Sequence, residues 1–159
     1  MTKRIFDSIN LIPFGVVALV LGLDIFVKQL VLLHMDKLPL FVVSFFGKVD
    51  LWIDLVYNKG AAWGSFAKFS QFLLVVRIII LFFVLILFFR SNDLLKKIAY
   101  SLVLAGALGN LYDTFSHGKV IDMVHFIFFG KSFGIFNLAD ASIFTGLITL
   151  LFSRKPIEV

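Results

Sequence analysis

Four long apolar segments constrain the fold of this chain more than any other feature of its sequence. They cover roughly residues 11–33, 72–89, 95–115 and 136–152, and each is close to the ~20 residues that a helix needs to cross the hydrocarbon core of a bilayer. The chain has 159 residues, of which 60% are hydrophobic. This is more apolar surface than a soluble domain of this size can bury. We predict a single all-α transmembrane domain over residues 1–159, built as a four-helix bundle.

The basic residues predict how this bundle is oriented in the membrane. Those on one side are concentrated in short segments beside the spans, whereas those on the other side are spread through longer connections. By the positive-inside rule, both chain termini then lie in the cytoplasm. The residues assigned to the cytoplasmic side are Lys3, Arg4, Arg90, Lys96, Lys97, Arg154 and Lys155.

The connection between the first two spans, approximately residues 38–70, has a different pattern. Apolar and polar residues alternate through part of it, and this period is typical of a strand with one buried face. We therefore expect a small extracytoplasmic β-sheet between spans one and two. The alternating residues are Val49, Asp50, Leu51, Trp52, Ile53 and Asp54.

Composition excludes several classes of function. The net charge of +5 is not arranged as a basic face with interleaved aromatic residues, so nucleic acid is not an expected partner. The absence of cysteine excludes disulfides, thiolate metal sites and acylation of the chain on its own Cys. His34, His117 and His125 are too far apart in the sequence to form a metal-binding motif, although folding could bring two of them together. Neither a convincing Ser–His pairing nor a Gly-rich phosphate loop occurs. We expect no metal and no cofactor.

Polar residues inside the predicted spans require an explanation, since a charge at a helix centre costs about 2.5 to 3.5 kcal/mol on insertion scales. Asp24 and Lys28 are four residues apart, with the acid first, so they share a helix face as an ion pair does. This spacing fits a structural pair and a catalytic role equally well. Arg77, near the outer end of span two, is expected to snorkel to the interface rather than to join a site.

The remaining polar residues are predicted to converge near one membrane interface. Asn110 and Asp113 share a face of span three, Asn137 and Asp140 share a face at the start of span four, and Asp122 lies in the connection between them. Such residues can simply bond helices together. Alternatively, two carboxylates that share one proton can activate a water while the protonated partner polarises a carbonyl, as in aspartic proteases.

Five blocks of the sequence, taken in order, resemble the signature of the lipoprotein signal peptidase (signal peptidase II) family. They extend from the first span to the last and fit the same four-span layout. The blocks are DxxxK at 24–28, NKGAAWG at 58–64, GALGNLYD at 106–113, VID at 120–122 and FNLAD at 136–140.

This resemblance implies an aspartic endopeptidase of the bacterial cytoplasmic (inner) membrane. Asp122 and Asp140 would form the catalytic dyad. Seven further residues would line or support the site: Asp24, Lys28, Asn58, Gly60, Asn110, Asp113 and Asn137.

The resemblance also implies a substrate and partners. The substrate would be a prolipoprotein, cut immediately before a Cys that carries a diacylglyceryl group. Membrane lipids and globomycin-type peptide inhibitors would be further partners of a monomeric enzyme.

One departure from the family pattern has a physical consequence. Thr114 stands where an Arg normally follows the Asp, and a Thr cannot supply the fork of donors of a guanidinium. Arg77, Lys119 and Lys28 are candidates to replace that cation. Ala105, where the family usually has the first of two glycines, and Met123, where Phe is common after the Asp, alter packing only slightly.

The sequence is also compatible with two other functions. A small transporter or proton-conducting protein would need acids distributed through the membrane depth, and a non-catalytic assembly subunit would use its amides only to bond helices.

Overall fold

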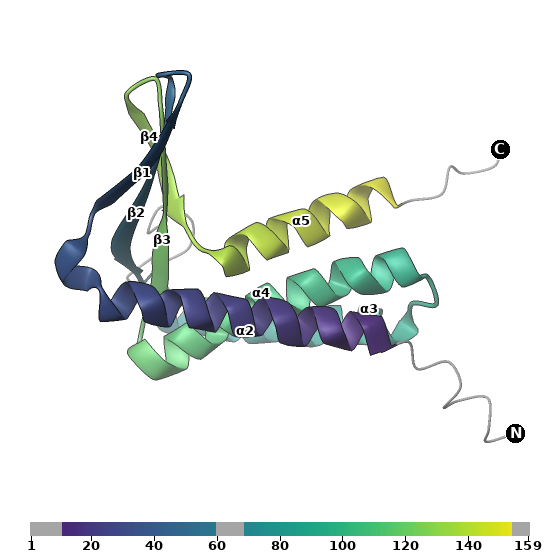
Figure 1. The fold of residues 1–159 in the computed structure, drawn as a ribbon. Helices are drawn as coiled ribbons and strands as arrows, with labels where there is room; N and C mark the ends of the chain where they lie inside the picture. Colours follow the sequence, from purple (N-terminus) through teal and green to yellow (C-terminus); the bar gives the residue numbers. More distant parts are fainter. Residues whose placement is uncertain (1–10, 60–68, 154–159) are drawn as a thin grey trace, which may run out of the picture.

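A computed structural model describes residues 11–59 and 69–153 of the chain. Gly60, one of the predicted site residues, lies outside the described residues, as do the basic residues near the two termini that contributed to the predicted orientation. Figure 1 shows the arrangement: a group of helices lies side by side, and a β-sheet stands across one end of them. We call the end of the helices beside the sheet the sheet end of the bundle.

The helices follow the predicted apolar segments closely. They are α2 (Leu11–Leu33), α3 (Ser70–Arg90), α4 (Leu94–His117) and α5 (Leu138–Phe152), with a short 3₁₀ helix, η1 (Met35–Lys37), after α2. α2, α3 and α4 are long and apolar enough to cross a membrane. α5 has 15 residues, which correspond to about 22 Å against a hydrocarbon core of ~30 Å. The described structure therefore shows three helices of spanning length and one shorter apolar helix.

Large apolar side chains cover the outside of these helices. Phe82, Phe83 and Phe89 of α3 are each more than half exposed, and Phe88 is the buried residue of that helix. Exposing such an apolar surface to water is unfavourable, whereas in a bilayer it contacts acyl chains. The exposure pattern supports the prediction of a multi-pass membrane protein.

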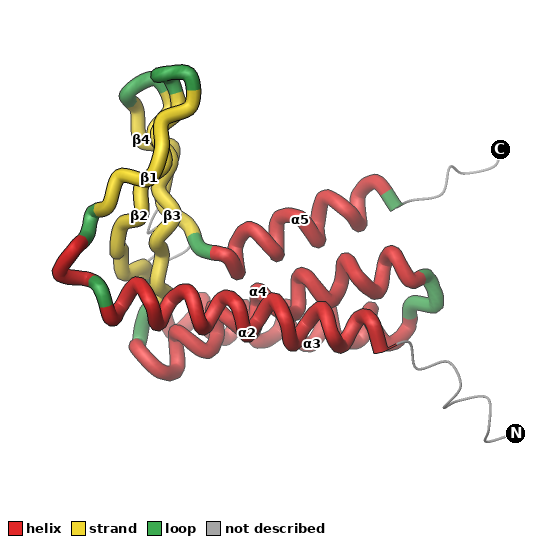
Figure 2. The backbone as a smooth tube through the Cα atoms, viewed as in Figure 1, coloured by secondary structure: helices red, strands yellow, loops and turns green. Residues whose placement is uncertain are grey.

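The four-stranded antiparallel sheet is larger than predicted. Its strands are β1 (Leu40–Phe45), β2 (Val49–Asn58), β3 (Val120–Phe128) and β4 (Lys131–Phe136), in the order β1-β2-β3-β4. The expected strands between the first two helices are present, but the connection between α4 and α5 supplies the other half of the sheet. The prediction of a sheet between spans one and two alone was therefore incomplete. Figure 2 shows the strands of both connections gathered beside one end of the helices.

Pairing of β2 with β3 joins two segments that are far apart in the sequence. In this register Val56 lies opposite Asp122, and Asn58 lies opposite Val120. Gly118, with φ of 68°, ends α4 in the left-handed region and allows the chain to turn directly into β3. The start of β3 is consequently held between β2 and the end of α4.

α4 is the centre of the bundle and contacts each of the other helices. α4 and α5 pack very closely at Gly106. A Cβ added there would overlap the backbone oxygen of Ala139 and approach the hydroxyl of Ser142 at 2.5 Å. Small residues allow membrane helices to approach in this way. This packing fixes the first turn of α5, and with it Asp140, against α4.

Candidate active site

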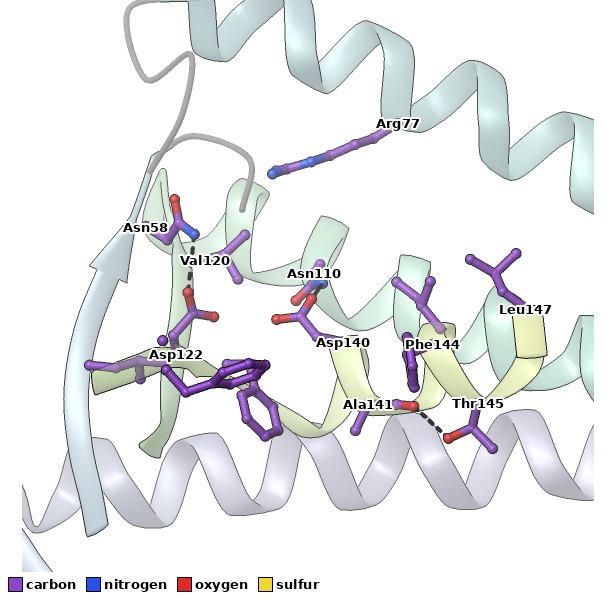
Figure 3. A pocket seen from close by; sticks show the side chains of 15 residues that line it. Asn58, Arg77, Asn110, Val120, Asp122, Asp140, Ala141, Phe144, Thr145 and Leu147 are labelled. Atoms are coloured by element: carbon purple, nitrogen blue, oxygen red, sulfur yellow. Dashed lines mark hydrogen bonds between the residues drawn. The ribbon is translucent and has the colours of Figure 1, made fainter. Parts of the chain in front are cut away.

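A cavity of about 870 Å³ opens between the sheet and the helices. Most of its wall is apolar, formed by β3, β4 and α5, and includes Phe133, Phe136 and Phe144. Its polar and charged lining residues, several of which are labelled in Figure 3, come from five different elements: Asn58, Arg77, Asn110, Asp122, Asp140 and Thr145.

Asp122 reaches this cavity from the start of β3. Its side chain is 3% exposed. One carboxylate oxygen accepts a hydrogen bond from Asn58 Nδ2 at 3.1 Å, and the other accepts one from Asn137 Nδ2 at 2.8 Å. Two amide donors from different elements thus fix the orientation of this carboxyl group.

The pKa of Asp122 is raised to about 6, from an ordinary value of 3.8. Burial is the main cause, because a carboxylate loses its hydration there, and the negative charge of Asp140 adds to the effect. The hydrogen bonds from Asn58 and Asn137 and the charge of Lys28 act in the opposite direction. Asp122 therefore keeps its proton to a higher pH than an exposed carboxyl group does.

Asp140 reaches the cavity from the first turn of α5. Asn137 is the N-cap of that helix, its side-chain oxygen accepts the backbone N–H of Asp140 at 2.8 Å, and the Asp140 carboxylate accepts the backbone N–H of Asn137 at 3.4 Å. This reciprocal capping box fixes the side chain relative to the helix axis. Asn110 Nδ2 donates to the other carboxylate oxygen at 2.7 Å.

Asn137 connects the two acids. Its Oδ1 accepts from the backbone of Asp140, while its Nδ2 lies 2.8 Å from Asp122 Oδ1. The side chain is fully buried. Figure 3 shows the carboxyl groups of Asp122 and Asp140 pointing toward one another in the cavity.

A buried ionic cluster, formed by Asp24, Lys28 and Asp113, lies behind this pair. Lys28 Nζ is 2.6 Å from Asp24 Oδ2 and 2.7 Å from Asp113 Oδ2, and all three side chains are at most 1% exposed. Asp24 also accepts the backbone N–H of Ala139, and Asp113 accepts that of Ile121. The cluster therefore ties α2 and α4 to the residues that precede Asp140 and Asp122 in the chain.

The family comparisons cover the elements that form this site. The model of the family described as signal peptidase (SPase) II matches residues 16–154. The chain belongs to the signal peptidase II family. Its relatives include the lipoprotein signal peptidase of Chlamydia muridarum (strain MoPn / Nigg), which is 39% identical over 141 residues, 84% of each chain.

Two further similarities extend over most of the chain. The lipoprotein signal peptidase of Staphylococcus carnosus (strain TM300) is 36% identical over 115 residues, which are 69% of this chain and 72% of the relative. A solved structure of a bacterial membrane enzyme matches 95% of this chain and 96% of its own, with a TM-score of 0.76 and 28% identity. The sheet and the helices are thus both part of the shared fold.

Most residues predicted for a signal peptidase II site do come together. Asn58, Asn110, Asp122 and Asp140 line the cavity. The other described ones stand directly behind it, where they contact lining residues or the backbone beside them: Asp24, Lys28, Asp113 and Asn137. For Asp24 and Lys28, which the spacing left undecided, the burial supports a structural role.

The expectation for Arg77 was wrong. Instead of snorkelling away from the site, its side chain lines the cavity, and Nη1 donates to Thr114 Oγ1 at 3.4 Å. Its contact with α4 could not be inferred from the sequence, because α3 shows no periodic pattern that orients the helix. The departure of Thr114 from the family pattern was the available signal, and it did place Arg77 among the three candidate cations.

The structure also contains a Ser–His contact that the sequence analysis did not identify. His125 Nε2 lies 2.8 Å from Ser132 Oγ, and His125 Nδ1 lies 3.6 Å from Asp54 Oδ2. These residues are on the sheet, and none of the three is among the described residues that line the cavity. No group of three side chains suited to a metal occurs within residues 11–59 and 69–153.

The raised pKa of Asp122 leads to a pH prediction for Asn58→Ala. Removing the Asn58 donor removes an interaction that favours the ionised carboxyl group, so the pKa of Asp122 should rise further. The proton is then lost at higher pH, and the basic limb of the kcat/KM profile should move upward. The measurement is kcat/KM against pH, with the exposed Asn92→Ala as the matched control. A downward shift, or an identical shift in both variants, would contradict a catalytic role for the protonated Asp122 side chain.

Proposed function

We propose that Asp122 and Asp140 are the catalytic dyad with which this protein hydrolyses the peptide bond before the diacylglyceryl-modified Cys of a prolipoprotein. The observation that carries the proposal is the pair of carboxyl groups that face each other in one cavity at the sheet end of the membrane helices. A lipid-modified Cys is anchored in the bilayer, so the adjoining peptide bond lies near the membrane interface, where these acids are expected.

The chemistry requires one proton on the pair. Burial raises the pKa of Asp122 to about 6, so the pair keeps a proton to a higher pH than exposed carboxyl groups do. We treat the two acids as one coupled system and write the mechanism with this proton on Asp122. Ionised Asp140 takes a proton from a water molecule as the water oxygen attacks the scissile carbonyl carbon, while Asp122 donates a hydrogen bond and then its proton to the carbonyl oxygen.

Collapse of the tetrahedral intermediate completes the reaction. The C–N bond breaks, the amide nitrogen of the Cys receives a proton from Asp140, and Asp122 recovers its proton from the intermediate's hydroxyl group. The products are the carboxyl terminus of the signal peptide and the free amino group of the lipidated Cys. No proton is gained or lost by the dyad over the cycle.

The apolar lining supports a substrate with an apolar signal segment. Phe144 and Leu147 of α5 line the cavity and are also 67% and 53% exposed. In a bilayer these side chains contact lipid, so the cavity wall is continuous with the lipid-facing surface. A peptide or an acyl chain can therefore enter from the membrane without first crossing water.

The test is cleavage by the purified protein in detergent micelles. Two precursors are compared, one with a diacylglyceryl-modified Cys and one with the unmodified Cys, and the products are identified by mass spectrometry. We expect cleavage immediately before the modified Cys and much slower cleavage of the unmodified precursor. Absence of cleavage in a folded, monodisperse preparation would refute the proposed activity.

For the membrane arrangement, we propose that α5 is a fourth span, that both termini are cytoplasmic, and that the protein acts as a monomer in the bacterial inner membrane. In support, α2 begins and α5 ends away from the sheet end (Figure 1). Binding of globomycin-type inhibitors is part of the same proposal.

The orientation is testable because the chain has no cysteine. An impermeant maleimide added to intact cells should label Phe46→Cys, whose parent side chain is 97% exposed between β1 and β2, and should leave Asn92→Cys, between α3 and α4, unlabelled. The reverse pattern would contradict the orientation.

A further inference from the structure

A cationic side chain enters the cavity from a helix that supplies none of the acids. Arg77 of α3 is the one Lys or Arg among the described residues that line the cavity. Figure 3 shows its side chain extending from α3 along the side of the cavity across from Asp140. A charged residue in a membrane-spanning helix is costly and usually marks a functional position, so its place in the cavity wall requires a reason.

The Thr114 side chain on α4 contacts the guanidinium of Arg77. The Thr114 hydroxyl donates to the backbone oxygen of Asn110 at 2.8 Å. Because a hydroxyl has a single proton, it acts as the acceptor for Arg77 Nη1 at 3.4 Å. Arg77 is therefore bonded to the residue one helical turn after Asn110, and Asn110 donates to Asp140 at 2.7 Å.

The other two candidate cations are engaged elsewhere. Lys28 is 1% exposed and is paired with Asp24 and Asp113. Lys119 Nζ stands 3.4 Å above the centre of the Tyr57 ring, and neither lysine is among the described lining residues. Of the three cations, Arg77 alone is among the described residues that line the cavity.

A peptide in this cavity needs hydrogen-bond donors for its backbone carbonyl groups. Its carbonyl groups leave water when they enter the apolar cavity, and each one left unpaired would weaken binding. A guanidinium has five N–H donors in a planar fork, enough to bond Thr114 and a peptide carbonyl at the same time.

Resting on the proposed function, we propose that Arg77 binds the backbone carbonyl oxygens of the signal peptide in the cavity, with Thr114 as the positioning residue that sets the guanidinium in place. The contact orients the peptide relative to Asp122 and Asp140 and takes no part in proton transfer. Arg77 is thus a determinant of substrate affinity supplied by α3.

The first experiment measures kcat and KM of Arg77→Met with the lipid-modified precursor. Loss of a charge-assisted hydrogen bond should raise KM by about 10- to 100-fold and change kcat by less than about 3-fold. Arg77→Lys should recover part of the affinity, because it keeps the charge without the fork. Arg90→Met, at the far end of the same helix, is the matched control and should resemble wild type.

The second experiment tests the role of Thr114. Thr114→Val keeps the shape and removes the hydroxyl, so KM should rise by a smaller factor than in Arg77→Met. In the double variant the two effects should not multiply, because Thr114 acts through Arg77. Fully multiplicative effects would exclude this positioning role.

The outcomes separate this inference from the proposed function. If wild type does not cleave the precursor, the proposed function fails. If wild type cleaves and Arg77→Met has the kinetics of Arg90→Met, the role of Arg77 is wrong and the function stands. A fall in kcat with unchanged KM would likewise overturn the binding role.

Discussion

Asp122→Asn and Asp140→Asn should each lower cleavage of a lipid-modified prolipoprotein by about 10³-fold or more, in a protein that still inserts and folds. Each substitution removes one half of a shared-proton pair while keeping nearly the same side-chain shape. General acid–base catalysis contributes about 10²- to 10⁴-fold for one group, and here one proton must pass through both groups. The double variant should be hardly worse than either single variant, because the acids act as a unit.

Folding must be measured alongside activity in these variants. Each carboxyl group accepts hydrogen bonds through both of its oxygens, and an Asn retains a single acceptor oxygen. One bond is therefore lost or reversed in each variant, at a cost of about 1 to 3 kcal/mol. A variant with a lower unfolding temperature but a monodisperse folded state at the assay temperature still tests the chemistry.

The matched control is Ser132→Ala. Ser132 and His125 are in contact on the sheet and offer the alternative of a serine nucleophile. If the dyad performs the reaction, Ser132→Ala should retain near wild-type kcat. Near wild-type cleavage by Asp122→Asn or Asp140→Asn, or loss of activity in Ser132→Ala with its fold intact, would reject the aspartic mechanism for this chain.

The sequence predicted the helices well because their signal is local. An apolar run of membrane-spanning length needs no knowledge of the tertiary structure, and α2 has the predicted bounds of Leu11–Leu33. β3 was missed because its local pattern does not indicate a strand with one buried face. Its sequence, VIDMVHFIF, is almost continuously apolar and lacks clear alternation, although Gly118 and Gly130 bound it in the way that turns bound a strand.

The site was predicted through family blocks, with spacing as a weaker guide. Asn110 and Asp113 are three residues apart, and both approach Lys28 in the structure. No local pattern, however, indicates that Asn58 lies beside Asp122, because that contact depends on the pairing of β2 with β3. The catalytic roles of Asp122 and Asp140 stay a prediction until the variants are measured.

The distribution of polar residues argues against the transporter alternative. The residues that line the cavity and the cluster behind it gather where the sheet meets the helices. α3 carries Arg77 in its interior and Arg90 at its end, with no acid between them. A proton or ion path across the membrane would instead require polar groups at successive depths, whereas a hydrolase needs them at one depth only.

Lys28→Met should strongly destabilise the protein, although Lys28 lies outside the cavity. The ammonium group lies between Asp24 and Asp113, at 2.6 and 2.7 Å. Removing it leaves two carboxylates without their cation in a region shielded from water, and breaking a buried ion pair in this way costs about 3 to 5 kcal/mol. The measurement is the unfolding midpoint in detergent, with the exposed Lys37→Met as the matched control.

A rescue experiment distinguishes an electrostatic cause from lost packing. In Lys28→Met/Asp24→Asn/Asp113→Asn the cluster is neutral, and the side-chain oxygens of residues 24 and 113 can still accept the backbone N–H groups of Ala139 and Ile121. Replacing a whole buried ionic group by neutral residues of similar size is often tolerated. The triple variant should therefore recover most of the stability lost in Lys28→Met. If it is no more stable than Lys28→Met, the two unpaired carboxylates are not the cause of the lost stability. The assignment of this cluster as an electrostatic tie between α2, α4 and the residues beside the dyad is then wrong.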